Sequence, residues 1–330
     1  MKKFIETLKN CWKIEDLRKR LLVTILFTAI YRFGSFIVLP GINPGLLEKL
    51  QSQTAGGLMS LLDMFSGGAF SKASIFALGI MPYISASIVM QLLAVAVPYF
   101  QKMQRDGESG HKKINWYTRV LTIVILLFQA PAYLINLKTQ AAGALATGVN
   151  WTLFMVSASI ILAAGSMFIL WLGERITDKG VGNGVSIIIM VGIIARLPQA
   201  FFQEVSSRFT AITSGGLVMF IVEIIILYLV VCAAILLTQG TRKIPVQYAK
   251  KVVGNKQYGG ARQYIPLKLF AANVMPIIFA QALMFIPLAI VQYSSDNTST
   301  VLQSLMNTKS LAYNCIYVLL IVVFTYFYTA

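Results

Sequence analysis

The sequence predicts an all-α, polytopic helical membrane protein, and three observations support this fold class. Hydrophobic residues make up 57% of the 330 residues, and charged residues make up only 12%. Several apolar runs reach about 20 residues, long enough to cross a hydrocarbon core of roughly 30 Å. The charged residues gather between these runs. A soluble core of this size would not need so many uninterrupted apolar runs.

We predict eight spans, near residues 21–40, 75–97, 117–137, 152–172, 184–203, 216–238, 268–292 and 311–330. With segment 1–20 in the cytoplasm, 21 of the 28 Lys and Arg residues fall in inside segments. Six fall in outside segments or adjoining helix ends, and Arg32 lies within the first span. Because basic residues accumulate on the cytoplasmic side of membrane proteins, this asymmetry predicts a cytoplasmic N-terminus.

The composition also excludes several classes of chemistry. The basic, amphipathic start MKKFIETLKNCWKIEDLRKR has no early apolar core with a cleavage site, so it does not resemble a removable signal peptide. Cys11, Cys232 and Cys315 are far apart and indicate neither a disulfide framework nor a CxxC metal site. The single histidine, His111, lies in a charged loop, which excludes His-based triads and His clusters. We expect no catalytic residues, no metal and no cofactor.

The run LMSLLDMFSGGAFSK, residues 58–72, lies between the first two spans. Its apolar residues Leu58, Leu61, Leu62 and Phe65 follow helical spacing. Ser66, Gly67 and Gly68 interrupt this helix before it could cross a membrane. Two interpretations stay open on the residues alone. The run is a re-entrant segment buried in protein, or it is an amphipathic helix on the outer leaflet.

The second and seventh predicted spans carry prolines and polar residues. In LGIMPYISASIVMQ, the residues Ile80, Ile84, Ser87 and Gln91 form one stripe of a helix. Pro82 lacks a backbone N–H, so we expect it to kink or hinge this span. The seventh span, LFAANVMPIIFAQALMF, repeats the pattern with Asn273, Pro276 and Gln281. These residues are either polar contacts between packed helices or mobile walls around a hydrated space.

Two connecting segments have distinctive compositions. ITDKGVGNGVSIII lacks the lysine motif of a phosphate-binding loop, so we expect a flexible helix start that places Asn183 near a cavity. The loop 239–268 carries seven basic residues and no acidic one, and Gly254-Asn255 predicts a hairpin turn within it. This loop either docks on ribosomal RNA or an acidic partner, or is a topological signal near anionic lipid.

Two ionisable residues inside spans, Arg32 and Glu223, raise other functional classes. A secondary transporter with inverted repeats is one alternative, but a single carboxylate within the spans, that of Glu223, gives little support for ion coupling. An intramembrane enzyme is another alternative. Such an enzyme needs a nucleophile–base pair or metal ligands, and the predicted spans offer neither. Whether Arg32 pairs with Glu223 stays open on the residues alone.

Four motifs, in order, resemble the bacterial SecY family: FSGGAFSKASIFALGIMPYISASIVMQLL, WLGERITDKGVGNGVSIII, IPLKL and AANVMPIIFAQAL. The resemblance runs through nearly the whole chain. It implies a channel of ten spans in two inverted halves, of which this chain holds about eight spans. The N-terminal half would be 21–206, and 207–330 would be an incomplete C-terminal half. The chain stops at Ala330, where the family continues.

The resemblance also implies site residues. The segment of about 58–70 would be a plug, made of Leu58, Leu61, Leu62, Phe65, Ser66, Gly67 and Gly68. An apolar pore ring would consist of Ile80, Ile84, Ile189 and Ile278, with Asn183 as a pore-proximal polar residue. A lateral gate would contain Pro82, Ser87, Gln91, Asn273, Pro276 and Gln281. The docking site for the ribosome or motor would contain Arg242, Lys243, Lys250, Lys251, Lys256 and Arg262.

The implied function is the translocation of unfolded polypeptides across the bacterial inner membrane and the lateral release of membrane segments. The implied partners are SecE, SecG, the SecA motor, the ribosome, signal-bearing chains and anionic lipids. The chain departs from the family pattern at Phe270, Asn273 and Asn255, where relatives often have Asn, Gly and Arg. We therefore expect a rearranged polar cluster at the gate and fewer charges at the loop tip.

Overall fold

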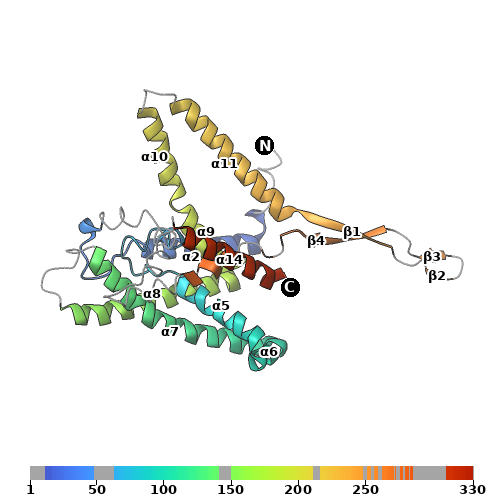
Figure 1. The fold of residues 1–330 in the computed structure, drawn as a ribbon, viewed down its shortest axis with the longest axis horizontal. Helices are drawn as coiled ribbons and strands as arrows, with labels where there is room; N and C mark the ends of the chain where they lie inside the picture. Colours follow the sequence, from blue (N-terminus) through green and yellow to red (C-terminus); the bar gives the residue numbers. More distant parts are fainter. Residues whose placement is uncertain are drawn as a thin grey trace. The chain divides into compact units, whose positions relative to one another are not determined.

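The computed structural model describes residues 12–47, 63–140, 150–210, 216–247, 251–253, 256–258, 262–270 and 310–329, with a few positions between 272 and 284. The chain divides into two compact units. One comprises Met1–Gln199 with Phe279–Val318, and the other comprises Ala200–Ile278 with Leu319–Ala330. Figure 1 labels the helices and strands of both.

The first unit is built from packed helices. They are α2 (Glu15–Gly34), α5 (Met81–Ala96), α6 (Pro98–Arg105), α7 (Glu108–Gln140), α8 (Trp151–Lys179), α9 (Gly184–Ile194) and the start of α10 (Leu197–Thr210), with a short 3-10 turn η1 (Pro44–Leu46). Helix α7 packs on α5 and α8, and α8 packs on α9 and α2. Leu126, Leu134, Phe154 and Leu162 lie in the core between them. The apolar faces of these helices therefore meet one another.

The chain between α2 and α5 is the irregular part of this unit, and we call residues 63–80 the connecting segment. Residues 63–65 are helical and residues 66–80 form turns. Ser74 pairs with Val38 in an antiparallel bridge, and the Ile75 amide donates to the Ile37 carbonyl oxygen at 2.9 Å. Gly67 and Gly68 have φ of 66° and 85°, values that favour glycine. The two glycines let the chain reverse directly after residues 63–65.

The predicted span 75–97 is wrong at its start, and so is the expected kink at Pro82. Helix α5 begins at Met81, with Ile80 as its N-cap residue and Pro82 in its first turn. An N–H there has no intrahelical acceptor, so proline starts this helix without breaking a hydrogen bond. Helix α5 is instead bent relative to α6, by 99° across Val97.

Five helices in the described parts of the chain are long and apolar enough to cross a membrane. They are Glu108–Lys138, Trp151–Lys179, Gly184–Arg208, Val218–Gln239 and Leu311–Thr329, and α5 with α6 makes a sixth if the bent pair is one span. These agree with six of the eight predictions. The first predicted span, 21–40, extends too far, because the helix α2 stops at Gly34. Helix α2 is not among the five helices above. The seventh starts too early, because Lys268 is the last residue of a strand.

The second unit contains a helical hairpin and a β-ribbon. Helix α10 is joined to α11 (Gly216–Gln239) by side-chain contacts, and the Phe201 and Phe220 ring centroids lie 6.0 Å apart. Arg208 on α10 pairs with Glu223 on α11 at 2.5 Å and with Glu204 at 2.8 Å. Glu223 therefore has Arg208 as its partner, which answers part of the open question about Arg32 and Glu223.

The ribbon follows α11 and confirms the predicted hairpin (Figure 1). Strand β1 (Thr241–Gln247) pairs antiparallel with β4 (Arg262–Lys268), and β2 (Lys251–Val253) pairs with β3 (Lys256–Tyr258). Val253 stands opposite Lys256, which agrees with a hairpin at the predicted Gly254-Asn255 pair, two residues outside the described part of the chain. The last helix is α14 (Leu311–Thr329). The outer pair β1 and β4 makes the ribbon longer than predicted.

Candidate functional site

The connecting segment is held against α2 and α7 by side-chain hydrogen bonds to its backbone, and against a third element by contacts between side chains. From α2, the Tyr31 hydroxyl donates to the Ser66 carbonyl oxygen at 3.3 Å, and Arg32 donates to that of Gly67 at 2.7 Å. From α7, the Tyr133 hydroxyl donates to the Phe70 carbonyl oxygen at 2.8 Å. The third element is the junction between α9 and α10. These contacts fix the segment at several points along its length.

The contact with the α9–α10 junction is an ion pair between Asp63 and Arg196. The Asp63 side chain is only 3% exposed, whereas that of Arg196 is 39% exposed. The same carboxylate accepts a hydrogen bond from the Ser71 amide at 2.8 Å, and Arg196 lies 3.3 Å from the Ser71 hydroxyl. Helix α9 ends at Ile194 and α10 begins at Leu197, so the break between them carries Arg196. One carboxylate therefore closes the loop 63–71 and ties it to another element.

Glycines allow helices to approach the connecting segment closely. A Cβ on Gly192 of α9 would lie 2.7 Å from the Phe65 carbonyl oxygen. A Cβ on Gly165 of α8 would lie 2.3 Å from the carbonyl oxygen of Ile75. Real Cβ atoms essentially never come this close to another heavy atom. The segment is therefore seated on glycine faces of α8 and α9.

Positive charge gathers beside Asp63. The Arg32 guanidinium lies 5.0 Å and the Lys72 ammonium 4.0 Å from the centre of the Phe36 ring. Burial lowers the pKa of Lys72 below its usual range, and Arg32 and Arg196 lower it further, while Asp63 opposes the shift. Lys72 is thus close to the cations Arg32 and Arg196 and to the buried carboxylate of Asp63.

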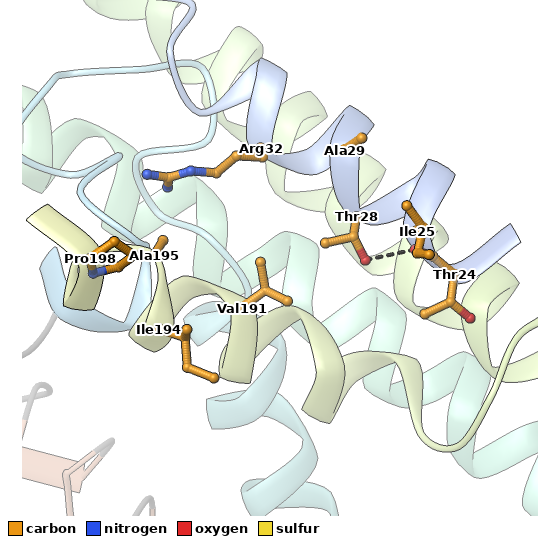
Figure 2. Close-up of a pocket in the computed structure, with 9 residues that line it drawn as sticks. All are labelled: Thr24, Ile25, Thr28, Ala29, Arg32, Val191, Ile194, Ala195 and Pro198. Atoms are coloured by element: carbon orange, nitrogen blue, oxygen red, sulfur yellow. Dashed lines mark hydrogen bonds between the residues drawn. The ribbon is translucent and has the colours of Figure 1, made fainter. Parts of the chain in front are cut away.

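A groove of about 550 Å³ lies between α2 and the α9–α10 region. Figure 2 shows Thr24, Thr28 and Arg32 among the residues on the α2 wall. Val191 and Ile194 lie on the opposite wall. The Thr28 hydroxyl donates to the Thr24 carbonyl oxygen at 2.7 Å. Apart from Arg32, the walls offer mainly apolar surface, so the groove suits an apolar segment better than an ion.

The predicted plug residues fall partly on the connecting segment. Phe65, Ser66, Gly67 and Gly68 belong to it, and Ser66 is buried. The Ser66 hydroxyl accepts a hydrogen bond from the Phe70 amide at 3.0 Å. Leu58, Leu61 and Leu62 lie outside the described residues. The re-entrant interpretation thus agrees with a segment folded into the helices of its unit.

The predicted pore ring divides between two helices. Ile80 and Ile84 lie one turn apart at the start of α5, where the Ile84 amide donates to the Ile80 carbonyl oxygen at 3.1 Å, and both side chains are buried. Ile189 is half-buried on α9. Ile278 lies outside the described residues. The structure thus brings Ile80 and Ile84 together and leaves the closure of the ring a prediction.

The predicted polar residues have local partners. Gln91 donates to the Ser87 hydroxyl at 3.3 Å, one turn apart on α5. The exposed Asn183 is the N-cap of α9 and accepts from the Ser186 amide at 3.2 Å, which gives it a capping role in the helix start. Pro82, Pro276 and Gln281 are buried, and Asn273 lies outside the described residues.

The predicted docking residues lie on the ribbon. Arg242 and Lys243 are exposed on β1, opposite Leu267 and Pro266 of β4. The other basic residues on described strands are Lys251, Lys256, Arg262 and Lys268, and Lys250 lies outside the described residues. The ribbon therefore carries basic residues along both of its strand pairs.

Known proteins match this chain over most of its length. The SecY family profile matches residues 74–330. The protein translocase subunit SecY of Thermotoga maritima is 41% identical over 330 residues, which cover 98% of this chain and 74% of that protein. The chain belongs to the SecY family.

Solved channels share the fold of this SecY family member. One is a SecY whose plug domain is described as stabilising the closed state of the translocation channel and maintaining a membrane seal, with a TM-score of 0.60 and 18% identity. Another is Sec61 in the canine ribosome–channel complex from the endoplasmic reticulum, with a TM-score of 0.59 and 18% identity. Each alignment covers 93% of this chain and 69% of the other. With its apolar helices, this SecY family member is a multi-pass membrane protein.

Sequence reasoning missed the Asp63–Arg196 pair and the role of Arg32. Arg196 is one of the six basic residues that the predicted topology assigns to outside segments or adjoining helix ends, and Arg32 binds the Gly67 carbonyl oxygen. Two features of the sequence mark the residues singly, although neither predicts that they pair. Asp63 is the single acidic residue between Glu48 and Asp106, and Arg196 directly precedes Leu197-Pro198 at the end of an apolar run.

Proposed function

We propose that this chain is the protein-conducting channel subunit of a bacterial Sec translocase. The observation that carries the proposal is its 41% identity, over 98% of its length, to a protein translocase subunit SecY. The substrates are unfolded secretory polypeptides, which cross the bacterial inner membrane, and membrane segments, which leave sideways into lipid. The chain performs no covalent chemistry. A motor ATPase, a translating ribosome or the membrane potential supplies the energy.

In this proposal the plug is the segment of about 58–70, whose described residues belong to the connecting segment. Its burial among α2, α7, α8 and α9 supports this role, because irregular backbone survives at membrane depth only inside protein or beside water. Ile80, Ile84, Ile189 and Ile278 form the pore ring. Branched apolar side chains suit it because an apolar constriction resists ions by dewetting.

The lateral gate consists of Pro82, Ser87 and Gln91 on one side and of Asn273, Pro276 and Gln281 on the other. A signal sequence leaves through it. SecE clamps the halves 21–206 and 207–330, SecG binds peripherally, and anionic lipids contact the basic inside segments. The N-terminus lies in the cytoplasm, as the distribution of Lys and Arg supports.

Site-specific crosslinking tests the pore assignment. Photoreactive residues replace Ile84, Ile189 and Ile278 one at a time in the full-length protein, with its partner subunits, while a secretory chain is stalled in transit. We expect crosslinks to the stalled chain at all three positions. Leu127, exposed on α7, is the lipid-facing control and should stay unreactive. Reaction at Leu127 with silence at the isoleucines would show that the pore lies elsewhere.

A further inference from the structure

We propose that Asp63 and Arg196 form an ionic latch that holds the connecting segment against the α9–α10 junction, and that opening of the channel requires the latch to break. The inference rests on the proposed channel function and names how that function is regulated. It assigns a gating role to Asp63, which lies within the predicted plug 58–70 but is not among its named residues, and to Arg196, which lies outside the predicted plug, pore ring and gate. The latch is defined as the Asp63–Arg196 ion pair together with the Ser71 contacts of both residues.

The position of Asp63 makes the latch effective. Its side chain is 3% exposed, and its carboxylate is bonded to Arg196 and to the Ser71 amide. A buried carboxylate that loses its cation keeps the full desolvation penalty without compensation. Asp63 therefore cannot leave Arg196 at low cost while the segment stays in place. Loss of the ion pair and displacement of the segment are coupled events.

The other anchors of the segment differ in kind. Tyr31, Arg32 and Tyr133 donate to backbone carbonyl oxygens, which are neutral acceptors. Among the ion pairs of the described residues, Asp63–Arg196 is the one that joins the segment to another element. Hydrogen bonds with an ionised donor or acceptor, such as that of Arg32, are roughly twice as strong as neutral ones, and in the latch both groups are ionised. The latch is therefore the strongest single polar contact that movement of the segment must break.

The two partners are unequally accessible, which indicates how the latch opens. The Arg196 side chain is 39% exposed, so its guanidinium can turn toward water or another anion, whereas Asp63 is enclosed. Arg196 also lies between two helices, in the short break between Ile194 and Leu197. A change in the angle between α9 and α10 would move Arg196 directly. The junction is thus placed to couple helix movement to release of the segment.

The test measures how often the segment opens in the absence of substrate. A single cysteine replaces Ser66, which is buried in the segment, after the three native cysteines are replaced by serine. The rate at which a water-soluble maleimide labels this cysteine is measured in the full-length protein with its partner subunits in lipid vesicles. The resting ion conductance of the same complex is measured in planar bilayers.

Asp63→Asn is the informative substitution. The amide oxygen of asparagine can still accept from the Ser71 amide, so loop closure is kept while the ion pair is lost. We expect labelling of the cysteine to rise by about ten-fold or more, because a hydrogen bond between charged groups changes an equilibrium by about that factor. Resting conductance should rise with it. Arg196→Gln should give the same result, and the double variant should add little to either change.

Arg208→Gln is the matched control. It also removes an arginine that pairs with carboxylates, Glu204 and Glu223, but it does not touch the connecting segment. Labelling and conductance should stay at the wild-type level. If Asp63→Asn and Arg196→Gln label like the wild type, or if their effects add as independent changes, the latch is wrong.

The outcomes separate the latch from the proposed function. A wild-type complex that translocates a secretory chain, with variants that label normally, overturns the latch alone. A wild-type complex that neither translocates nor crosslinks at the pore ring overturns the channel function itself. Copurification of the partner subunits with each variant shows whether the variant has folded.

Discussion

Tyr133 shows at the scale of one residue how α7 holds the connecting segment. Its hydroxyl donates to the Phe70 carbonyl oxygen at 2.8 Å, and its ring packs edge-on against the Phe70 ring with centroids 4.8 Å apart. The same carbonyl oxygen also accepts from the Ala73 amide at 3.2 Å. The hydroxyl therefore adds a second donor to an oxygen that is already bonded.

Tyr133→Phe should cost about 1 kcal/mol of stability, the usual value of one neutral hydrogen bond. The cost stays small because the ring packing is kept and the Phe70 oxygen keeps its backbone donor. The measurement is thermal unfolding of the purified complex, where a lower transition temperature is expected. Tyr228→Phe, at an exposed position on α11, should leave that temperature unchanged. Equal transition temperatures for Tyr133→Phe and the wild type would show that the hydroxyl contributes nothing.

Single residues also show what a sequence can and cannot predict. The serine and glycines of the connecting segment are recognisable because Ser66, Gly67 and Gly68 stand together after an apolar run. The latch was not recognisable, because Asp63 and Arg196 are 133 positions apart and only the fold brings them together. Each charge alone has a simpler interpretation as a topological or surface residue. Pairing across the chain carries no local signal.

At the scale of elements, the contact between α9 and the connecting segment depends on Gly192. Gly192→Ala places a methyl group 2.7 Å from the Phe65 carbonyl oxygen, which is a backbone atom and cannot rotate away as a flexible side chain can. Overpacking of this kind costs typically about 1–3 kcal/mol. We expect lower thermal stability of the complex and faster maleimide labelling at the Ser66→Cys position.

Gly45→Ala is the control for this substitution, because a Cβ on Gly45 meets no atom within 4 Å. It should change neither the stability nor the labelling rate. Normal labelling in Gly192→Ala would mean that α9 moves aside and that the glycine contact does not hold the segment.

The start of α5 explains why an element boundary was predicted wrongly. Residues 75–80 are as apolar as the helix that follows, so hydropathy extends the span back to residue 75. The structure instead forms turns through Gly79, whose φ is 57°, and begins the helix at Met81. Proline fits in a first helical turn, so the same residue that suggests a kink in the sequence marks the start of α5. Burial alone does not distinguish a packed turn from a helix.

At the scale of the whole molecule, the predicted spans were most accurate for helices whose ends are determined by length and hydropathy alone. Helices α8, α11 and α14 agree with their predictions to within a few residues at most ends. This accuracy has a physical reason, since the thickness of the hydrocarbon sets the length of a helix that only has to cross it. Helix α2 differs from its predicted span at both ends. Its first turns carry the charged stretch from Glu15 to Arg20, and after Gly34 the chain leaves the helix to pair with the connecting segment.

The β-ribbon carries the proposed docking residues for the ribosome. An isolated two-stranded ribbon is marginally stable in water, and this one exposes Ile244 and, opposite it, Ile265. Its exposed residues also include Arg242 and Lys243, which are adjacent on β1 and so point to opposite faces. We propose that the ribosome covers both faces, with the basic side chains on phosphates of ribosomal RNA.

Arg242→Gln with Lys243→Gln should therefore weaken the binding of ribosomes to the reconstituted complex. The salt dependence of binding should also become less steep, by up to about two units in the slope of log K against log salt, because two phosphate contacts are lost. Lys102→Gln with Lys113→Gln removes the same charge from another predicted inside segment and is the control. If both pairs weaken binding equally, the ribbon is only part of a diffuse positive surface. If neither changes the slope, the ribbon does not contact the RNA, and its exposed apolar residues must meet a protein surface instead.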